Sequence, residues 1–168
     1  MEAVDYEAEL SAAKARSSLQ LLFKAARLLN ERAIATVRER TNRPVRIAHT
    51  LLLPHVDLEG TRLTDLASRL GVTKQAAGQL VDELVAMGML ERAPDPADAR
   101  AKLVKFSKRG RAALLEGLGV LGELEAEVAA WIGEAKMHVL HEALGAIVER
   151  EEERTREPPA KERRSRRR

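Results

Sequence analysis

The stretch from Leu63 to Asp82 restricts the fold of this chain more than any other. Its apolar residues recur at the intervals expected of two short helices packed across each other: Leu66, Leu70, Val72 and Leu80. Ala67 supplies a small side chain where the helices cross, and Gly71 lies at the turn, where glycine adopts a left-handed backbone without steric cost. The spacing predicts a helix-turn-helix, a motif that binds DNA in many proteins. An ordinary helical hairpin with a solvated polar face is the alternative.

The second helix of this motif is expected to have one apolar and one polar face. The residues expected to pack inward are Val72, Ala77, Leu80, Val81 and Leu84. Those expected to face outward, toward bases, are Thr73, Lys74, Gln75 and Gln79, because Gln binds adenine edges and Lys binds guanine or phosphate. Ala77 is smaller than the residue usual at its position. Gly78 costs up to about 1 kcal/mol of helix stability, which indicates either a close backbone approach or no function.

Two short strand-like segments follow, at residues 90–93 and 101–106, with the turn-rich segment from Pro94 to Asp98 between them. A basic hairpin beside a helix-turn-helix is a wing. Arg100 is placed to enter a minor groove, and Lys102 lies in the returning strand. Asp98 is expected to support Arg100 rather than to contact DNA, because phosphates repel a carboxylate.

The rest of the chain is expected to be helical, since aromatic residues make up only 2% of it and Ala and Leu dominate its apolar positions. Helices are predicted at residues 7–40, 44–53, 64–71, 73–88, 107–133 and 135–154. Thr64, Thr73 and Ser107 are the expected N-caps of three of them. The predicted fold class is therefore mainly α with a small β-hairpin wing. Residues 1–156 are expected to form one domain, and 157–168 a disordered basic tail.

Composition narrows the function further. The chain has no cysteine, which excludes disulfides and thiolate zinc sites, and no apolar run long enough for a signal peptide or membrane span. We expect a cytoplasmic protein without a membrane partner. His138 and His141 are too few to predict a metal site, and no catalytic or cofactor motif is present, so neither an enzyme nor a cofactor is expected. The net charge is +3, but residues 62–111 hold ten basic and six acidic residues, which favours a polyanionic partner.

The segment from Leu63 to Leu114 resembles the MarR family of bacterial winged-helix transcriptional regulators. The residues that match the family's pattern are Arg92, Asp95, Pro96, Asp98, Arg100, Ser107 and Gly110. Ala99 departs from it, because the family usually has an arginine there. The resemblance implies a homodimer that binds a palindromic operator in double-stranded DNA, and a small-molecule effector that lowers DNA affinity from a pocket beside the dimer interface.

The residues themselves also favour a dimer. Apolar side chains recur at helical spacing in the last two helices: Leu114, Leu118, Leu121, Val128, Ile132, Met137, Leu140, Leu144 and Ile147. The helix-turn-helix and wing, at about residues 63–106, offer little surface to cover them. Dimerisation helices are therefore expected at about 7–40 and 107–154. The predicted function is a dimeric, ligand-responsive repressor. The alternative is a winged-helix module for protein interaction or assembly, without a specific operator.

Overall fold

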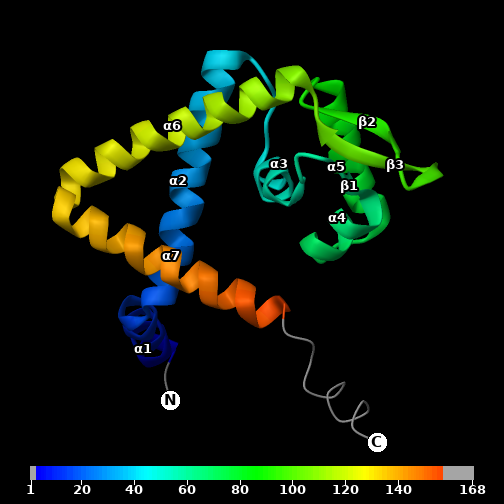
Figure 1. The fold of residues 1–168 in the computed structure, drawn as a ribbon. Coiled ribbons are helices and arrows are strands. Elements are labelled where there is room, and N and C mark those ends of the chain that lie inside the picture. Colours follow the sequence, from blue (N-terminus) through cyan, green and yellow to red (C-terminus); the bar gives the residue numbers. More distant parts are fainter. Residues whose placement is uncertain (1–2, 157–168) are drawn as a thin grey trace, which may run out of the picture. The chain divides into compact units, whose positions relative to one another are not determined.

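The structure is a computed structural model that describes residues 3–156 (Figure 1). The predicted tail at 157–168 lies outside the described residues. The helices are α1 (Ala3–Arg16), α2 (Ser18–Thr41), α3 (Ile47–Leu52), α4 (Leu63–Leu70), α5 (Lys74–Ala86), α6 (Lys108–Ile132) and α7 (Glu134–Arg156), with a short 3-10 turn at Leu53–His55. The strands are β1 (Thr61–Arg62), β2 (Leu90–Asp95) and β3 (Asp98–Phe106). The predicted fold class, mainly α with a β-hairpin wing, is confirmed.

The three strands form one antiparallel sheet in the order β1, β3, β2. Thr61 pairs with Val104 and Arg62 with Leu103, so β1 joins the hairpin at its base. Figure 1 shows the β2–β3 hairpin continuing past β1 to a free tip, as expected of a wing. The strand at β1 was not predicted, because two residues are too few to show an alternating pattern.

The core lies where the helix-turn-helix meets the sheet and the start of α6. Its buried residues are Leu52, Val56, Leu66, Val81, Leu84, Met89, Leu90, Val104, Phe106 and Ala113. These come from six elements and the short connections between them, so the relative positions of α4, α5 and the wing are fixed by one shared apolar cluster. The two helices of the motif and the wing therefore share one packed base.

Local capping explains several helix boundaries. Gly71 ends α4 in the left-handed conformation (φ 65°), as its place in the motif predicts. The Thr73 side chain caps α5 by accepting a hydrogen bond from Ala76 N at 3.2 Å. Ser107 Oγ accepts one from Gly110 N at 2.8 Å at the start of α6. The caps predicted at Thr73 and Ser107 are confirmed.

Two predicted helices differ from those observed. The single helix predicted at residues 7–40 is interrupted at Ser17, whose extended backbone and side-chain bond to Gln20 N start α2 afresh. The helix predicted from Pro44 begins only at Ile47, because Asn42 is left-handed (φ 52°) and Arg46 is extended (φ −124°).

Two smaller predictions are also wrong. Thr64 does not cap α4: Arg62 occupies that position without a side-chain cap, and Thr64 Oγ1 donates to Asp65 instead. The wing strands are longer than expected, because Asp95 pairs with Asp98 and only two residues, Pro96 and Ala97, form the turn.

The described chain divides into two compact units, and the boundary falls between Gly122 and Glu123 within α6. The first unit holds α1 to β3 and most of α6, including the core above. The second holds the end of α6, a turn at Gly133 and α7. Among residues 3–156, no helix is both long and apolar enough to span a membrane.

Candidate nucleic-acid interface

The second helix of the motif, α5, presents its predicted outward residues together. Lys74, Gln75 and Gln79 are exposed and line one open groove of about 930 Å³, together with Gly78 between them. On the opposite face Ala77, Val81 and Leu84 are fully buried, as predicted. Thr73 is exposed at the end of the helix, but its hydroxyl is engaged in the cap. The first two turns of α5 thus offer amide and ammonium groups to a partner.

Two expectations about this helix are changed by the structure. Val72 is 42% exposed, so the prediction that it packs inward is wrong, because the turn carries it away from the core. A Cβ added at Gly78 would meet Leu63 Cδ2 at 3.7 Å, which is ordinary contact. Packing within the described chain therefore does not require glycine at this position.

The wing brings its predicted residues to one side of β3. Asp98, Arg100 and Lys102 alternate along the strand and are exposed, which places them on the same face. Asp98 Oδ1 accepts a hydrogen bond from the backbone N of Arg100 at 3.0 Å. Asp98 therefore contacts Arg100 through its main chain, and the guanidinium projects from a fixed backbone.

The sequence matched Asp95 to the family's pattern, but it did not predict the contacts through which Asp95 and Arg62 hold the wing turn. Asp95 is buried, and its Oδ1 accepts from Ala97 N at 2.9 Å while its Oδ2 accepts from Arg62 Nε at 2.7 Å. The Ala97 N–H and then the Arg62 guanidinium hold the pKa of Asp95 below its ordinary value. Arg62 lies 33 residues away in β1, so the only sequence signal was an acidic residue before the turn proline.

Two carboxylates of α5 also line the groove, and each has a basic partner. Asp82 Oδ1 accepts from Arg92 Nη2 at 2.7 Å. Glu83 Oε2 binds Arg46 Nη2 and also lies 2.9 Å from His49 Nε2. These partners offset negative charge that would otherwise repel a polyanion. None of these three pairs could be predicted from the sequence pattern.

His49 is buried and its hydrogen bonds define its tautomer. Its Nδ1 accepts from the backbone N of Arg46 at 3.1 Å, so the ring proton must lie on Nε2, which donates to Glu83. Arg46 and then His49 hold the pKa of Glu83 below its ordinary value. The short helix α3 is thereby attached to the middle of α5.

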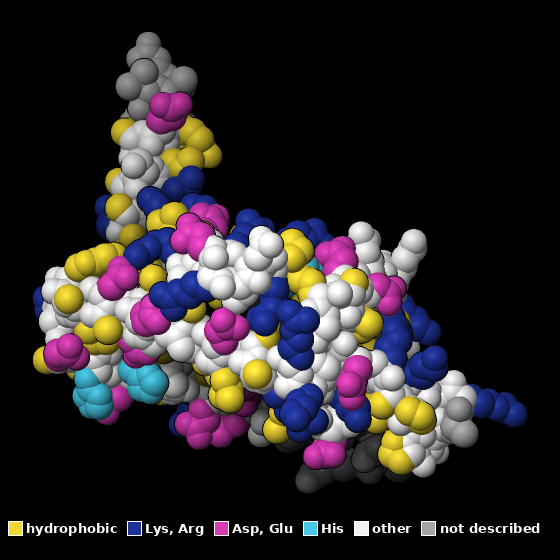
Figure 2. Space-filling model, turned by 90° about the horizontal axis from the view of Figure 1, so that it is seen from above, with side chains coloured by type: hydrophobic (Ala, Val, Ile, Leu, Met, Phe, Trp, Pro, Cys, Tyr) yellow, Lys and Arg dark blue, Asp and Glu magenta, His cyan; other side chains and the backbone are white. Residues whose placement is uncertain are grey.

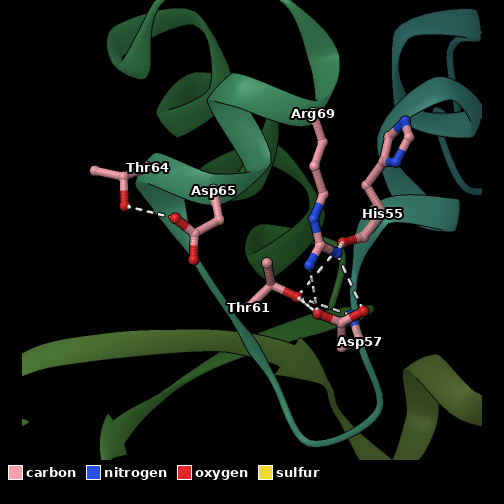
Figure 3. Close-up of polar contacts among 6 residues, drawn as sticks. All are labelled: His55, Asp57, Thr61, Thr64, Asp65 and Arg69. Carbon is pink, nitrogen blue, oxygen red and sulfur yellow. Dashed lines mark hydrogen bonds and ion pairs between the residues drawn. The ribbon is translucent and has the colours of Figure 1, made fainter. Parts of the chain in front are cut away.

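A second network attaches α4 to the segment before β1 (Figure 3). Arg69 Nη1 donates to His55 O at 2.8 Å and to Asp57 Oδ1 at 3.1 Å, and Thr61 Oγ1 donates to Asp57 Oδ2 at 2.9 Å. Hydrogen bonds from Arg69 and Thr61 hold the pKa of Asp57 below its ordinary value. The network fixes the first helix of the motif against the base of the sheet.

The surface charge agrees with this placement. Figure 2 shows Lys and Arg side chains (dark blue) over much of this face, including its right-hand side. The exposed basic residues of the hairpin and the start of α6 include Arg100, Lys102, Lys108, Arg109 and Arg111. A polyanion would meet this positive surface beside the groove of α5.

The helix-turn-helix and the wing match the model of a known protein family. The model of the MarR family matches residues 46–101, which run from Arg46 through both helices of the motif into the wing. The winged helix-turn-helix of this chain is thus similar to that of the MarR family. The resemblance predicted from the sequence is confirmed, and the chain has the fold of MarR-family transcriptional regulators.

Solved structures support the same fold. The chain is similar to RV1404 from Mycobacterium tuberculosis, with 26% identity and a TM-score of 0.65, covering 95% of this chain and 99% of that one. It is similar to MarR from E. coli, with 22% identity and a TM-score of 0.56, covering 75% and 96%.

A third similar structure is the transcriptional repressor CouR, bound to a 23-mer DNA duplex, with 21% identity and a TM-score of 0.58, covering 80% and 94%. CouR from Rhodococcus jostii RHA1 has also been solved with p-coumaroyl-CoA. No curated protein sequence matches this chain significantly.

An apolar cavity of about 460 Å³ adjoins the core, whose residues Val56, Met89, Phe106 and Ala113 form part of its lining. It is bordered by α2, the turn after α3 and α6, and its lining includes Ala33, Ile34, Val37, Val56, Phe106 and Leu118. Its few polar lining residues include Asn30 and Thr50, which are bonded to each other (Nδ2 to Oγ1, 3.0 Å). A largely apolar space of this size is typical of small-molecule sites.

Proposed function

We propose that this protein is a dimeric, sequence-specific DNA-binding transcriptional regulator that represses its target genes. The observation that carries the proposal is the groove of α5, where Lys74, Gln75 and Gln79 converge next to a basic wing. A recognition helix reads bases from such side chains in the major groove, while Arg100 and Lys102 would reach the neighbouring minor groove and backbone. Thr73 would lie close to the DNA because it caps the N-terminal end of this helix.

Selection of duplexes from random DNA tests this proposal. At controlled salt, wild-type protein should enrich a palindrome, because two recognition helices related by dimer symmetry meet half-sites about 34 Å apart. The double variant K74A/Q79A should lose the enriched sequence while retaining weak nonspecific binding. If wild-type protein enriches no sequence, the proposal fails, and a winged-helix module for protein interaction becomes the better interpretation.

The dimer is supported by apolar side chains that the single chain leaves exposed. In α2 these include Leu19, Leu21 and Phe23; in α7 they are Val139, Leu140, Ile147 and Val148, with Trp131 near the end of α6. Phe23 is 64% exposed and Trp131 is 66% exposed, which is unusual for such large side chains. A second copy would cover them, and light scattering at micromolar concentration should give the mass of two chains.

The apolar cavity supports regulation by a small molecule. Val45 and Thr50 line it, and the adjacent residues Arg46 and His49 bind Glu83 of α5. A ligand that displaces α3 would therefore disturb the recognition helix. An apolar fluorescent dye should bind wild-type protein and weaken its complex with DNA, whereas Ala33→Trp, which fills the cavity, should prevent dye binding. Dye binding with unchanged DNA affinity would contradict this part of the proposal.

A further inference from the structure

A small hollow at the junction of α2 and α3 is lined by three arginines. Its volume is about 340 Å³, and Arg38, Arg43 and Arg46 surround it with Asn42 and Pro44. It lies outside the residues predicted to contact DNA. The left-handed backbone of Asn42 turns the chain sharply here, which brings arginines from the end of α2 and from the linker to one place.

Each arginine is anchored by the protein on one side. Arg38 Nε donates to Val45 O at 2.7 Å, Arg43 Nη1 donates to Glu116 Oε2 at 3.1 Å, and Arg46 Nη2 donates to Glu83 Oε2. A guanidinium has five N–H donors, so one anchor fixes its position and leaves others available to a ligand. The three side chains are thus placed without being fully satisfied.

The cluster is short of acceptors. Glu83 and Glu116 each balance one cation, whereas the anchor of Arg38 within the described part of the chain is a neutral carbonyl group. Among the described residues, Arg43 Nε is buried without a hydrogen-bond partner. Positive groups that converge on a hollow repel each other unless an anion lies between them. A ligand with several charged oxygens would balance the positive charge that the two carboxylates leave over.

We propose that this hollow binds a phosphate group, supplied by the DNA backbone beside the recognition helix. Planar guanidinium groups bind phosphate oxygens in pairs, which suits a site built from arginines. Arg46 connects the hollow to the groove of α5, because its partner Glu83 lines that groove. The inference rests on the proposed DNA-binding function, while a free phosphate group would satisfy the same chemistry.

The salt dependence of DNA affinity tests the proposal in the full-length protein. R38Q and R46Q each remove one cation from the hollow, and R27Q is the matched control, because Arg27 is an exposed α2 residue paired with Glu31. In a plot of log affinity against log salt, each lost phosphate contact should make the slope shallower by about 0.9. R38Q and R46Q should show this change and R27Q should not. Circular dichroism should confirm folding, and R38K should recover part of the slope.

Inorganic phosphate distinguishes the source of the anion. If R38Q and R46Q keep the wild-type slope, DNA is not the source, and phosphate should then raise the wild-type melting temperature above that in chloride at equal ionic strength. That rise should disappear in both variants. Unchanged slopes together with no phosphate-specific rise would overturn the proposal. If wild-type protein binds no DNA, the proposed function fails. The phosphate-specific rise in melting temperature then shows by itself whether the hollow binds phosphate.

Discussion

Arg62 and Asp95 form an ion pair at the base of the wing turn, with Nε 2.7 Å and Nη2 2.6 Å from the same carboxylate oxygen. The pair joins β1 to the end of β2, and the other oxygen of Asp95 binds Ala97 N. The turn is therefore fixed from both sides. Arg100, which follows this turn, projects from a backbone that the pair holds in place.

Loss of this pair should weaken DNA binding without abolishing the fold. We expect Asp95→Asn to lower the melting temperature and the DNA affinity. Replacing the carboxylate removes the ionic partner of Arg62 and loosens the turn. Arg62→Gln should have a similar effect. In the double variant, the decreases in stability and DNA affinity should be clearly less than the sum of those in the single variants, since each substitution removes the same interaction. Additive losses, measured by thermal unfolding and DNA titration, would show that the two residues act independently.

Removal of the wing arginine should affect DNA binding alone. Arg100→Ala should weaken operator binding by about 1–3 kcal/mol if the side chain enters a groove. Its side chain is exposed, so thermal unfolding should be unchanged. Arg27→Ala on α2 is the control for the loss of one positive charge. Wild-type affinity in Arg100→Ala would remove this residue from the interface.

The Asp57–Arg69 pair should make stability depend on pH. Because the folded-state pKa of Asp57 is lowered by Arg69 and Thr61, its ionised form is favoured in the folded state. The stabilisation is therefore fully present above the unfolded pKa of about 3.9 and is lost as the pH falls through the folded-state value. Denaturant unfolding should show wild-type protein more stable than Asp57→Asn at pH 7, and the difference should shrink toward pH 2. A difference that is constant with pH would contradict this account.

The parts of the fold that could be predicted from the sequence depend on neighbours in the chain. The turn at Gly71 and the caps at Thr73 and Ser107 are local, since each partner lies within a few residues. The polar and apolar faces of α5 follow from helical periodicity in the same way. These features were sufficient to identify the motif and its outward residues.

The features that could not be predicted join distant segments. Arg46 and Glu83 lie 37 residues apart, and Arg62 and Asp95 lie 33 apart, so no local pattern relates them. The helix break at Ser17 was not predicted for another reason. Serine is tolerated inside a helix, and only its extended backbone in the structure shows that it caps a new helix. The electrostatic support of α5 and of the wing therefore required the structure.

Two glycines of α6 should respond in opposite ways to the same substitution. A Cβ added at Gly110 would lie 1.7 Å from Met89 O, so Gly110→Ala must displace backbone in the core of the winged helix-turn-helix. The melting temperature should fall, with a cost of about 1–3 kcal/mol or more for overpacking. A Cβ at Gly117 has nothing within 4 Å, so Gly117→Ala should stabilise the helix by up to about 1 kcal/mol. Thermal or denaturant unfolding of both variants measures the contrast, and a stable Gly110→Ala protein would show that α6 does not pack against Met89 as described.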